Sequence, residues 1–250
     1  NELESYYKAG WLRDETEYLA GETMQLIYRL QADERVKYLN RHLPCLAQAK
    51  VLDLGAGFGY FGEALRQAGV HQYYATDPNP ESLVHLRERA VLACRDISEM
   101  PDKDFDLITA SQVLEHLREP CAFMHMALGR LKRGGYFYLD VPERDDTFKP
   151  MLDPHVVVYT IQSIENLMAR IGLQLVHITG FGARRSNIIE AAKIRNRVLR
   201  RLKAGFERLT GCFQDDASRQ EARRRVLYNE FQFDQEGQDR WWLRALFLKP

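Results

Sequence analysis

Closely spaced glycines mark the stretch at 51–62, which reads VLDLGAGFGYFG. Gly55, Gly57 and Gly59 occupy alternate positions, and Gly62 follows three residues later. Glycine lets a backbone turn sharply and leaves no Cβ atom between the backbone and a ligand. A helical pattern follows, so the amide groups of its first turn would face whatever binds there. The spacing therefore predicts a loop that cradles a nucleotide cofactor.

Asp77 is placed to bind the ribose of such a cofactor. It follows a predicted strand at 72–76 and lies 22 residues after Gly55, near the spacing at which an acidic residue meets ribose hydroxyls. An ionised carboxylate accepts hydrogen bonds from both hydroxyls of a vicinal diol. We therefore predict that Asp77 binds ribose, and the alternative is a cap for the helix predicted at 81–90.

Two classes of cofactor use a glycine turn of this kind. The spacing GxGxxG at 57–62 matches the dinucleotide fingerprint, which favours a nicotinamide cofactor. The wider pattern, with Asp53 two residues before Gly55, resembles motif I of the class I S-adenosylmethionine-dependent methyltransferases, of the small-molecule type. The run DFDLITASQVLEHL at 104–117 strongly resembles the same family. The resemblance covers about residues 48–182 and the last strand, and several motifs in order are more specific than one glycine pattern.

The resemblance implies a set of contacts to S-adenosylmethionine. In this family the acidic residue at Asp53 helps to fix the amino-acid part of the cofactor. Asp96, at the end of a short third strand, matches a carboxylate that takes the adenine amino group, and Ile97 would flank the ring. Ser111 and Gln112 would lie beside the methionine sulfur. The predicted cofactor-binding residues are thus Asp53, Gly55, Gly57, Gly59, Asp77, Asp96, Ile97, Ser111 and Gln112.

His116 and His155 are the candidate catalytic residues. A hydroxyl acceptor usually has to lose its proton, and a histidine can take it near neutral pH. His116 would lie on a helix that we expect to open at Gln112, where a hydrogen bond to the sheet is its alternative role. His155 follows a long charged loop at 143–154, and in related enzymes this loop often carries a histidine near the substrate.

Metal ligands show no recognisable spacing in the sequence, so we expect no metal ion. Ligands can also converge from distant positions, which spacing does not reveal. The four cysteines share no short spacing either, which suits a reducing cytosol. They are Cys45, Cys94, Cys121 and Cys212.

These residues need a sheet whose strands end at a common edge. The alternation of apolar runs and helical patterns predicts an α/β fold with a doubly wound, mostly parallel sheet. The resemblance implies the seven-stranded, Rossmann-like methyltransferase form, with N-terminal helices and a helical insertion before a last antiparallel strand. The expected strands are 50–54, 72–76, 92–96, 104–111, 136–141, 173–179 and one within 241–250.

Three regions follow from this pattern. Residues 1–44 are expected to form an N-terminal helical lid, with packing against the sheet edge as the alternative. Residues 45–182 and 239–250 form the S-adenosylmethionine-binding core, and 183–238 form a basic helical insertion. Within 183–225, Lys and Arg outnumber Asp and Glu by 13 to 5. This basic face is either solvated or attracts an anionic substrate or a membrane surface, so peripheral membrane contact through it is one expectation.

Bulk composition narrows the class of protein. The chain has 250 residues and a formal net charge of +0 at pH 7, so its overall charge makes no case for nucleic acid. Its apolar runs fall short of the roughly 20 residues that span a bilayer, and a signal peptide is not evident. We expect a cytoplasmic protein. Asn1 in place of Met is compatible with a missing upstream segment.

The resemblance implies methyl transfer from S-adenosylmethionine to a small-molecule acceptor. We expect this acceptor to be a hydroxyl of a sugar, a glycoconjugate or a secondary metabolite, with an anionic or glycosylated compound as the partner and no nucleic acid. The alternatives are a nicotinamide-dependent oxidoreductase, a non-catalytic cofactor-binding protein and an RNA methyltransferase that uses the basic insertion. The oxidoreductase would need a second catalytic domain, for which the chain has little room.

Overall fold

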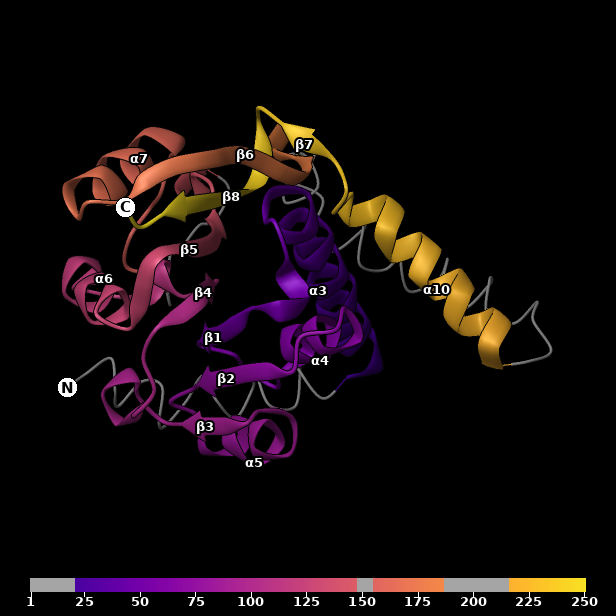
Figure 1. Ribbon diagram of the computed structural model, residues 1–250. Helices are drawn as coiled ribbons and strands as arrows, with labels where there is room; N and C mark the ends of the chain where they lie inside the picture. Colours follow the sequence, from indigo (N-terminus) through magenta and orange to yellow (C-terminus); the bar gives the residue numbers. More distant parts are fainter. Residues whose placement is uncertain (1–20, 148–154, 187–215) are drawn as a thin grey trace.

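A single twisted sheet forms the centre of the computed structural model, which describes residues 21–147, 155–186 and 216–250 (Figure 1). The strand order is β3-β2-β1-β4-β5-β8-β6-β7. Strands β1 to β5 pair in parallel, and β8 lies antiparallel between β5 and β6. The strands are β1 (Lys50–Leu54), β2 (Gln72–Thr76), β3 (Leu92–Cys94), β4 (Phe105–Ser111), β5 (Leu131–Pro142), β6 (Gln174–Arg184), β7 (Glu236–Gly237) and β8 (Arg240–Leu248).

This sheet confirms the predicted fold class, including the antiparallel strand at the end of the chain. The seven expected strands are present, and the two-residue β7 adds an eighth at the edge beside β6. The α-helices of the described residues are α3 (Glu22–His42), α4 (Tyr60–Gln67), α5 (Pro80–Arg89), α6 (Pro120–Leu128), α7 (Ile161–Arg170) and α10 (Asp216–Phe231).

Helices cover both faces of the sheet. Apolar side chains of α3, α4 and α5 pack with one face, and those of α6 and α7 pack with the other (Figure 1). In α4, for example, Phe61, Ala64 and Leu65 recur at helical spacing and are buried. Helix α7 begins at a capping box, in which Thr160 and Ser163 exchange side-chain and backbone hydrogen bonds. The two layers hold the strand ends in fixed register.

The segment after β4 departs from the expected structure. We expected a helix opening at Gln112, but that residue has φ +55°, which a helix does not accept. A short 3-10 helix, Leu114–His116, follows instead. Helix α6 then begins at Pro120, because proline suits the first turn of a helix. The expected helix at 112–117 is therefore wrong, and the residues there lie on a tight loop at the sheet edge.

The N-terminal region and the insertion are described only in part. Helix α3 contributes Leu30, Tyr38 and Leu39 to the core with 0% exposure, so its described residues are packed against the sheet. Helix α10 contacts α3 and extends away from the sheet (Figure 1). The aromatic cluster expected at 6–18 and the basic stripe expected at 193–209 lie outside the described residues. Every helix of the described part is too short or too polar to cross a membrane.

Candidate active site

The strand order reverses between β1 and β4, and this point locates the site. From β1 the chain runs outward through β2 to β3, and it then crosses back to β4 on the other side of β1. Open α/β sheets bind ligands in the crevice at the carboxyl ends of the strands on either side of such a reversal. Here β1 leads into the glycine turn, and β4 ends at Ser111.

The three alternating glycines adopt the left-handed backbone that their type permits. Gly55, Gly57 and Gly59 have φ values of +66°, +55° and +80°. A Cβ atom built on Gly55 would lie 2.5 Å from Cγ2 of Val113, so the loop after β4 rests directly against the turn. A Cβ atom on Gly57 would meet no described atom within 4 Å. Open space above a left-handed glycine is what a backbone that receives a ligand requires.

Asp77 braces the glycine turn from the end of β2. Its Oδ2 accepts the N–H of Gly57 at 2.7 Å, and its Oδ1 accepts the N–H of Asn79 at 2.9 Å. Burial raises the pKa of Asp77, and these backbone donors oppose the rise. The cap of α5 is Asn79, which accepts from the N–H of Glu81, so the alternative role that we gave Asp77 falls to Asn79. Ribose binding by Asp77 stays a prediction.

Asp53 lies inside the sheet. Its carboxylate accepts the hydroxyl of Thr109 at 2.7 Å and the hydroxyl of Tyr73 at 3.0 Å, and the residue is 2% exposed. Burial raises its pKa to about 6, although both hydroxyl donors act in the opposite direction. Asp53 therefore ties β1 to β2 and β4 at the base of the site. The contact of Asp53 with the amino-acid part of the cofactor stays a prediction.

The turn after β3 places Asp96 on the surface and Ile97 in the core. The Oδ1 atom of Asp96 accepts the N–H of Ser98 at 2.7 Å and so caps the 3-10 helix Ile97–Glu99. Ile97 is 2% exposed and belongs to the larger core cluster. A capping carboxylate keeps a second oxygen that can accept further hydrogen bonds, so the predicted contact with adenine stays open as a prediction.

Ser111 and Gln112 stand at the end of β4, beside Asp140 of β5. The Oγ atom of Ser111 is buried and finds no hydrogen-bond partner among the described residues. Gln112 donates its backbone N–H to the carbonyl of Asp140 at 2.8 Å and its side-chain Nε2 to Oδ1 at 3.2 Å. An unsatisfied buried hydroxyl is costly, which is consistent with a ligand that completes it.

The sequence analysis missed a buried ion pair below Gln112. Arg35 of α3 donates through Nε to Oδ2 of Asp140 at 2.6 Å and through a second nitrogen to Oδ1 at 3.2 Å. Burial alone would lower the pKa of Arg35, but the facing carboxylate outweighs it and raises the pKa above its usual value. The only signal in the sequence was a charged residue within an apolar pattern, Arg35 in α3 and Asp140 in β5. That signal does not show that the two residues pair.

The two candidate catalytic histidines come together. The ring centroids of His116 and His155 lie 4.8 Å apart in an edge-on arrangement. Nδ1 of His155 pairs with the carboxylate of Asp145, which is 1% exposed. Glu115, also 1% exposed, lies with Oε1 at 3.9 Å from Nε2 of His116. The sequence predicted both histidines but neither carboxylate.

These groups also bear on the expectation of no metal. Glu115, His116 and His155 each offer one ligand atom, and these atoms lie within 4.8 Å of one another. The sequence spacing did not show this group, because His155 comes from a segment about forty residues away. We expected no metal ion from the spacing of ligands along the chain, and spacing does not reveal ligands that converge from distant positions.

Comparison with known proteins decides the family. A family model described as a methyltransferase domain matches residues 22–178, more than half of the chain. The chain belongs to this family. The match confirms the resemblance and the expected class, that of S-adenosylmethionine-dependent methyltransferase domains.

Curated relatives of this methyltransferase domain cover part of the chain. A ubiquinone biosynthesis O-methyltransferase of Xylella fastidiosa is 30% identical over 120 residues, which are 44% of this chain and 48% of that protein. The tRNA U34 carboxymethyltransferase of Idiomarina loihiensis is 32% identical over 120 residues, which are 42% of this chain and 37% of that protein. The chain thus spans about half, or less, of the length of these relatives.

Solved structures extend the likeness in fold. A SAM-dependent methyltransferase from Thermotoga maritima, named as a possible histamine N-methyltransferase, covers 99% of this chain and 100% of its own with a TM-score of 0.62 and 14% identity. Phosphoethanolamine N-methyltransferase 2 of Haemonchus contortus, solved with S-adenosyl-L-methionine, has a TM-score of 0.62 and 15% identity over 99% of this chain and 60% of its own. At these identities the likeness shows the fold alone.

The site of this methyltransferase domain fits the cofactor of its class. The left-handed Gly57 leaves open space above the turn, and the buried hydroxyl of Ser111 lacks a partner in the described part of the chain. Both lie at the carboxyl ends of the strands that flank the reversal. Backbone amides at the start of α4 and a buried hydroxyl at the end of β4 are groups that a polar nucleoside ligand can use.

Proposed function

We propose that this protein transfers a methyl group from S-adenosylmethionine to a hydroxyl oxygen of a small-molecule acceptor, such as a sugar, a glycoconjugate or a secondary metabolite. The observation that carries the proposal is the pair formed by His155 and Asp145 beside His116. The pair lies against the loop that follows β4, because the backbone N–H of Val156 donates to the carbonyl of Glu115 at 2.8 Å.

A hydroxyl acceptor needs a group that removes its proton. S-adenosylmethionine supplies a methyl carbon that is already activated, so the protein has to align and deprotonate the acceptor. Asp145 holds Nδ1 of His155, which leaves Nε2 as the atom that would take the proton. A carboxylate in this position fixes the ring and stabilises the imidazolium that forms. An amine acceptor would need only a deprotonated nitrogen, so the histidine–aspartate pair favours oxygen.

The names of similar proteins include one that methylates oxygen and one that methylates nitrogen, which is the competing acceptor atom. The Xylella fastidiosa relative is named as an O-methyltransferase, whereas the Haemonchus contortus neighbour in fold is named as an N-methyltransferase. The first matches at 30% identity over 44% of this chain, and the second at 15% identity over 99% of it. We therefore assign the hydroxyl to this chain and keep amines as the comparison in the test.

Methyl transfer to matched alcohols and amines tests this function. The wild-type protein is incubated with labelled S-adenosylmethionine and a panel of sugars, phenols and amines. We expect transfer to a hydroxyl compound, and we expect His155→Gln to lower kcat by roughly 10² to 10⁴, the range of a lost general base. Affinity for S-adenosylmethionine should not change, because the base contacts the acceptor.

The control is His125→Gln, since His125 is exposed on α6 and its ring contacts only a local carbonyl among the described residues. It should keep full turnover. Transfer to amines alone would refute a hydroxyl as the acceptor. Unchanged turnover in His155→Gln would refute His155 as the base.

A further inference from the structure

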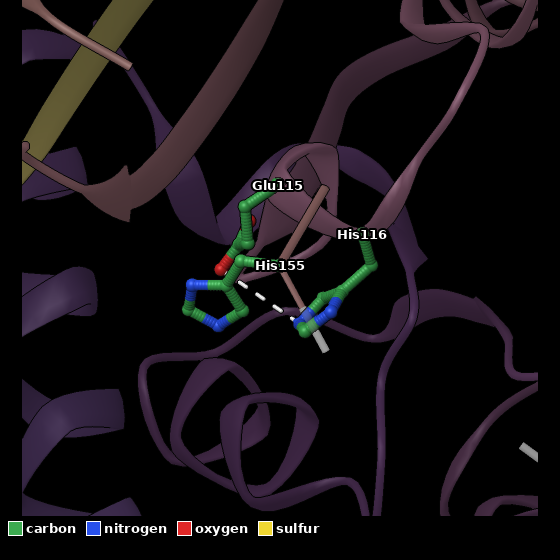
Figure 2. Close-up of side chains that lie close together, drawn as sticks. All are labelled: Glu115, His116 and His155. Carbon is green, nitrogen blue, oxygen red and sulfur yellow. Dashed lines mark ion pairs between the residues drawn. The ribbon is translucent and has the colours of Figure 1, made fainter. Parts of the chain in front are cut away.

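We propose that Glu115, His116 and His155 bind a divalent transition-metal ion of the zinc or iron(II) type. The three side chains gather at one point, as Figure 2 shows, although they come from two separate segments of the chain. Two imidazoles and a carboxylate are a common ligand set for such ions in enzymes that leave positions open for a substrate.

The distances suit an ion after a small adjustment. The three ligand atoms lie within 4.8 Å of one another. Ligands about 2.1 Å from a tetrahedral ion lie roughly 3.4 Å apart. Movement of the ligand atoms by up to about 1.4 Å closes the difference. His116 and His155 are the partly exposed members that can move, at 18% and 11% exposure.

The backbone already holds the two segments together. The N–H groups of Val156 and Val157 both donate to the carbonyl of Glu115, at 2.8 and 3.2 Å. The hydroxyl of Tyr159 donates to the carbonyl of Leu114 at 3.3 Å. These bonds fix the segment that carries His155 to the loop that carries Glu115 and His116. The ligands are therefore brought together before an ion binds.

Asp145 supplies the outer partner that such a site needs. A histidine that binds a metal through one ring nitrogen usually donates its other N–H to a carboxylate or carbonyl. Nδ1 of His155 pairs with the buried carboxylate of Asp145, so we assign Nε2 of His155 to the ion. The contact with Asp145 fixes the ring of His155 in the same way whether His155 serves as a base or as a metal ligand.

The chemistry of the ligands selects the ion. Imidazole nitrogen suits zinc, iron, cobalt and nickel, whereas magnesium and calcium prefer oxygen ligands. A site with two nitrogens and one carboxylate therefore should bind Zn²⁺ or Co²⁺ and discriminate against Mg²⁺. Three protein ligands leave a fourth position for water or an acceptor oxygen.

The location of the ion deepens the proposed function, on which this step rests. Strand β4 ends at Ser111, and Gln112 and Glu115 follow on the loop after it. An acceptor hydroxyl bound to the ion would release its proton to solvent, because coordination lowers the pKa of a bound oxygen. The O–H bond breaks and its electron pair stays on the oxygen, which would form the new bond to the methyl carbon of S-adenosylmethionine. The bond from sulfur to that carbon would break, its electron pair would go to sulfur, and S-adenosylhomocysteine would leave. Nε2 of His155 would then hold the ion, so this inference keeps the transfer to oxygen and replaces the role of base that the proposed function gives to that atom.

Metal binding to the full chain is measured directly. The protein is freed of metal with a chelator and titrated with Co²⁺ and Zn²⁺, and the visible absorption of bound Co²⁺ reports the coordination. We expect about one equivalent to bind. His116→Ala and His155→Ala should each weaken binding by roughly 100-fold or more, and Asp145→Asn by about 10- to 100-fold as an outer partner. His125→Ala is the matched control and should bind like the wild type.

Distinct outcomes separate this site from the proposed function. Failure of the wild type to bind Co²⁺ or Zn²⁺, preference for Mg²⁺, or unchanged binding in His116→Ala would each overturn the metal site. S-adenosylmethionine titration of the same variants shows that they remain folded, because the glycine turn is formed by other residues, at 55–59. Full methyl transfer by chelated, metal-free protein, with loss of turnover in His155→Gln, would refute the metal and leave His155 as the base. Metal binding without any methyl transfer would refute the function and leave the metal site.

Discussion

Buried carboxylates at the ends of neighbouring strands have different tasks in this molecule. Asp77 accepts backbone N–H groups of the glycine turn, whereas Asp53 accepts hydroxyls from the strands on either side of it. Backbone donors at a turn fix the shape of a loop. Hydroxyl donors within a sheet satisfy a group that has lost its water. Asp77 thus shapes the site, whereas ionisation of the buried Asp53 lowers the stability of the folded protein.

The cost at Asp53 predicts how stability depends on pH. Burial raises its pKa to about 6 in the folded protein, and an unfolded Asp titrates near about 3.9. Between these values the folded state binds a proton that the unfolded state lacks. Its contribution to stability is therefore complete below about pH 4 and is lost as pH rises through about 6.

Asp53→Asn should remove this dependence, because the amide does not ionise. We expect the stability of the variant relative to the wild type to rise by about 1 to 3 kcal/mol between pH 4 and pH 7. Urea unfolding at several pH values measures the difference. Asp234→Asn, on an exposed residue, is the control and should show no such trend. A constant difference between Asp53→Asn and the wild type would contradict the raised pKa.

At the scale of elements, α3 positions the end of β5. The bond from Arg35 to Asp140 joins them, and Asp140 also accepts from Gln112 and from the hydroxyl of Tyr138. One carboxylate thereby connects the N-terminal helix with the loop that carries the candidate site. Helix α3 lies within the region 1–44 that we expected to form a lid, and through Arg35 it supports the site from within the core.

Arg35→Met tests this support. Removal of one partner of a buried ion pair costs about 3 to 5 kcal/mol, because the other charge stays buried without compensation. We expect a loss of this size in urea unfolding and weaker binding of S-adenosylmethionine through Gln112. Arg29→Met on the same helix is the matched control. Arg29 pairs with Glu63 but is 43% exposed, so we expect a loss below about 1 kcal/mol.

The double variant Arg35→Met with Asp140→Asn completes the comparison. Removing the stranded charge should recover part of the stability that the single variant loses. Equal losses in Arg35→Met and Arg29→Met would show that the buried pair does not anchor α3.

The sequence predicted elements well where a local pattern decides them. Strands β1 and β2 have the predicted bounds, because continuous apolar runs end at a glycine turn or an acidic residue. The loop at Gln112 was missed, since its left-handed φ accompanies a hydrogen bond to Asp140 that only the folded sheet provides. The pairing of His155 with Asp145 was missed for the same reason, because two residues ten positions apart on the connection from β5 to α7 have to meet before either has its partner.

At the scale of the whole molecule, the first and the last described elements, α3 and β8, both pack in the sheet that carries the site. Strand β8 lies between β5 and β6, and its residues Trp242 to Leu248 pair with β5 along its length. Helix α3 packs on the same strands from one face. The carboxyl end of β5 is thus held both by Arg35 of α3 and by the pairing with β8. A ligand at that edge should stabilise the fold as one unit.

Stabilisation by S-adenosylmethionine tests this arrangement. At about 100 times its Kd, a ligand that binds only the folded state adds about 2.7 kcal/mol, which for a chain of this size raises Tm by roughly 5 to 10 °C. We expect this shift with S-adenosylmethionine and none with NADH at the same concentration. Gly57→Ala should abolish the shift, because a methyl group would enter the space above the turn. Gly134→Ala is the matched control, since Gly134 also has a left-handed φ, +73° against +55°, and equally open surroundings. Both variants place alanine at a left-handed φ, so a shift retained by Gly134→Ala and lost by Gly57→Ala would assign the effect to the glycine turn. An equal shift in all three proteins would mean that the cofactor binds elsewhere on the chain.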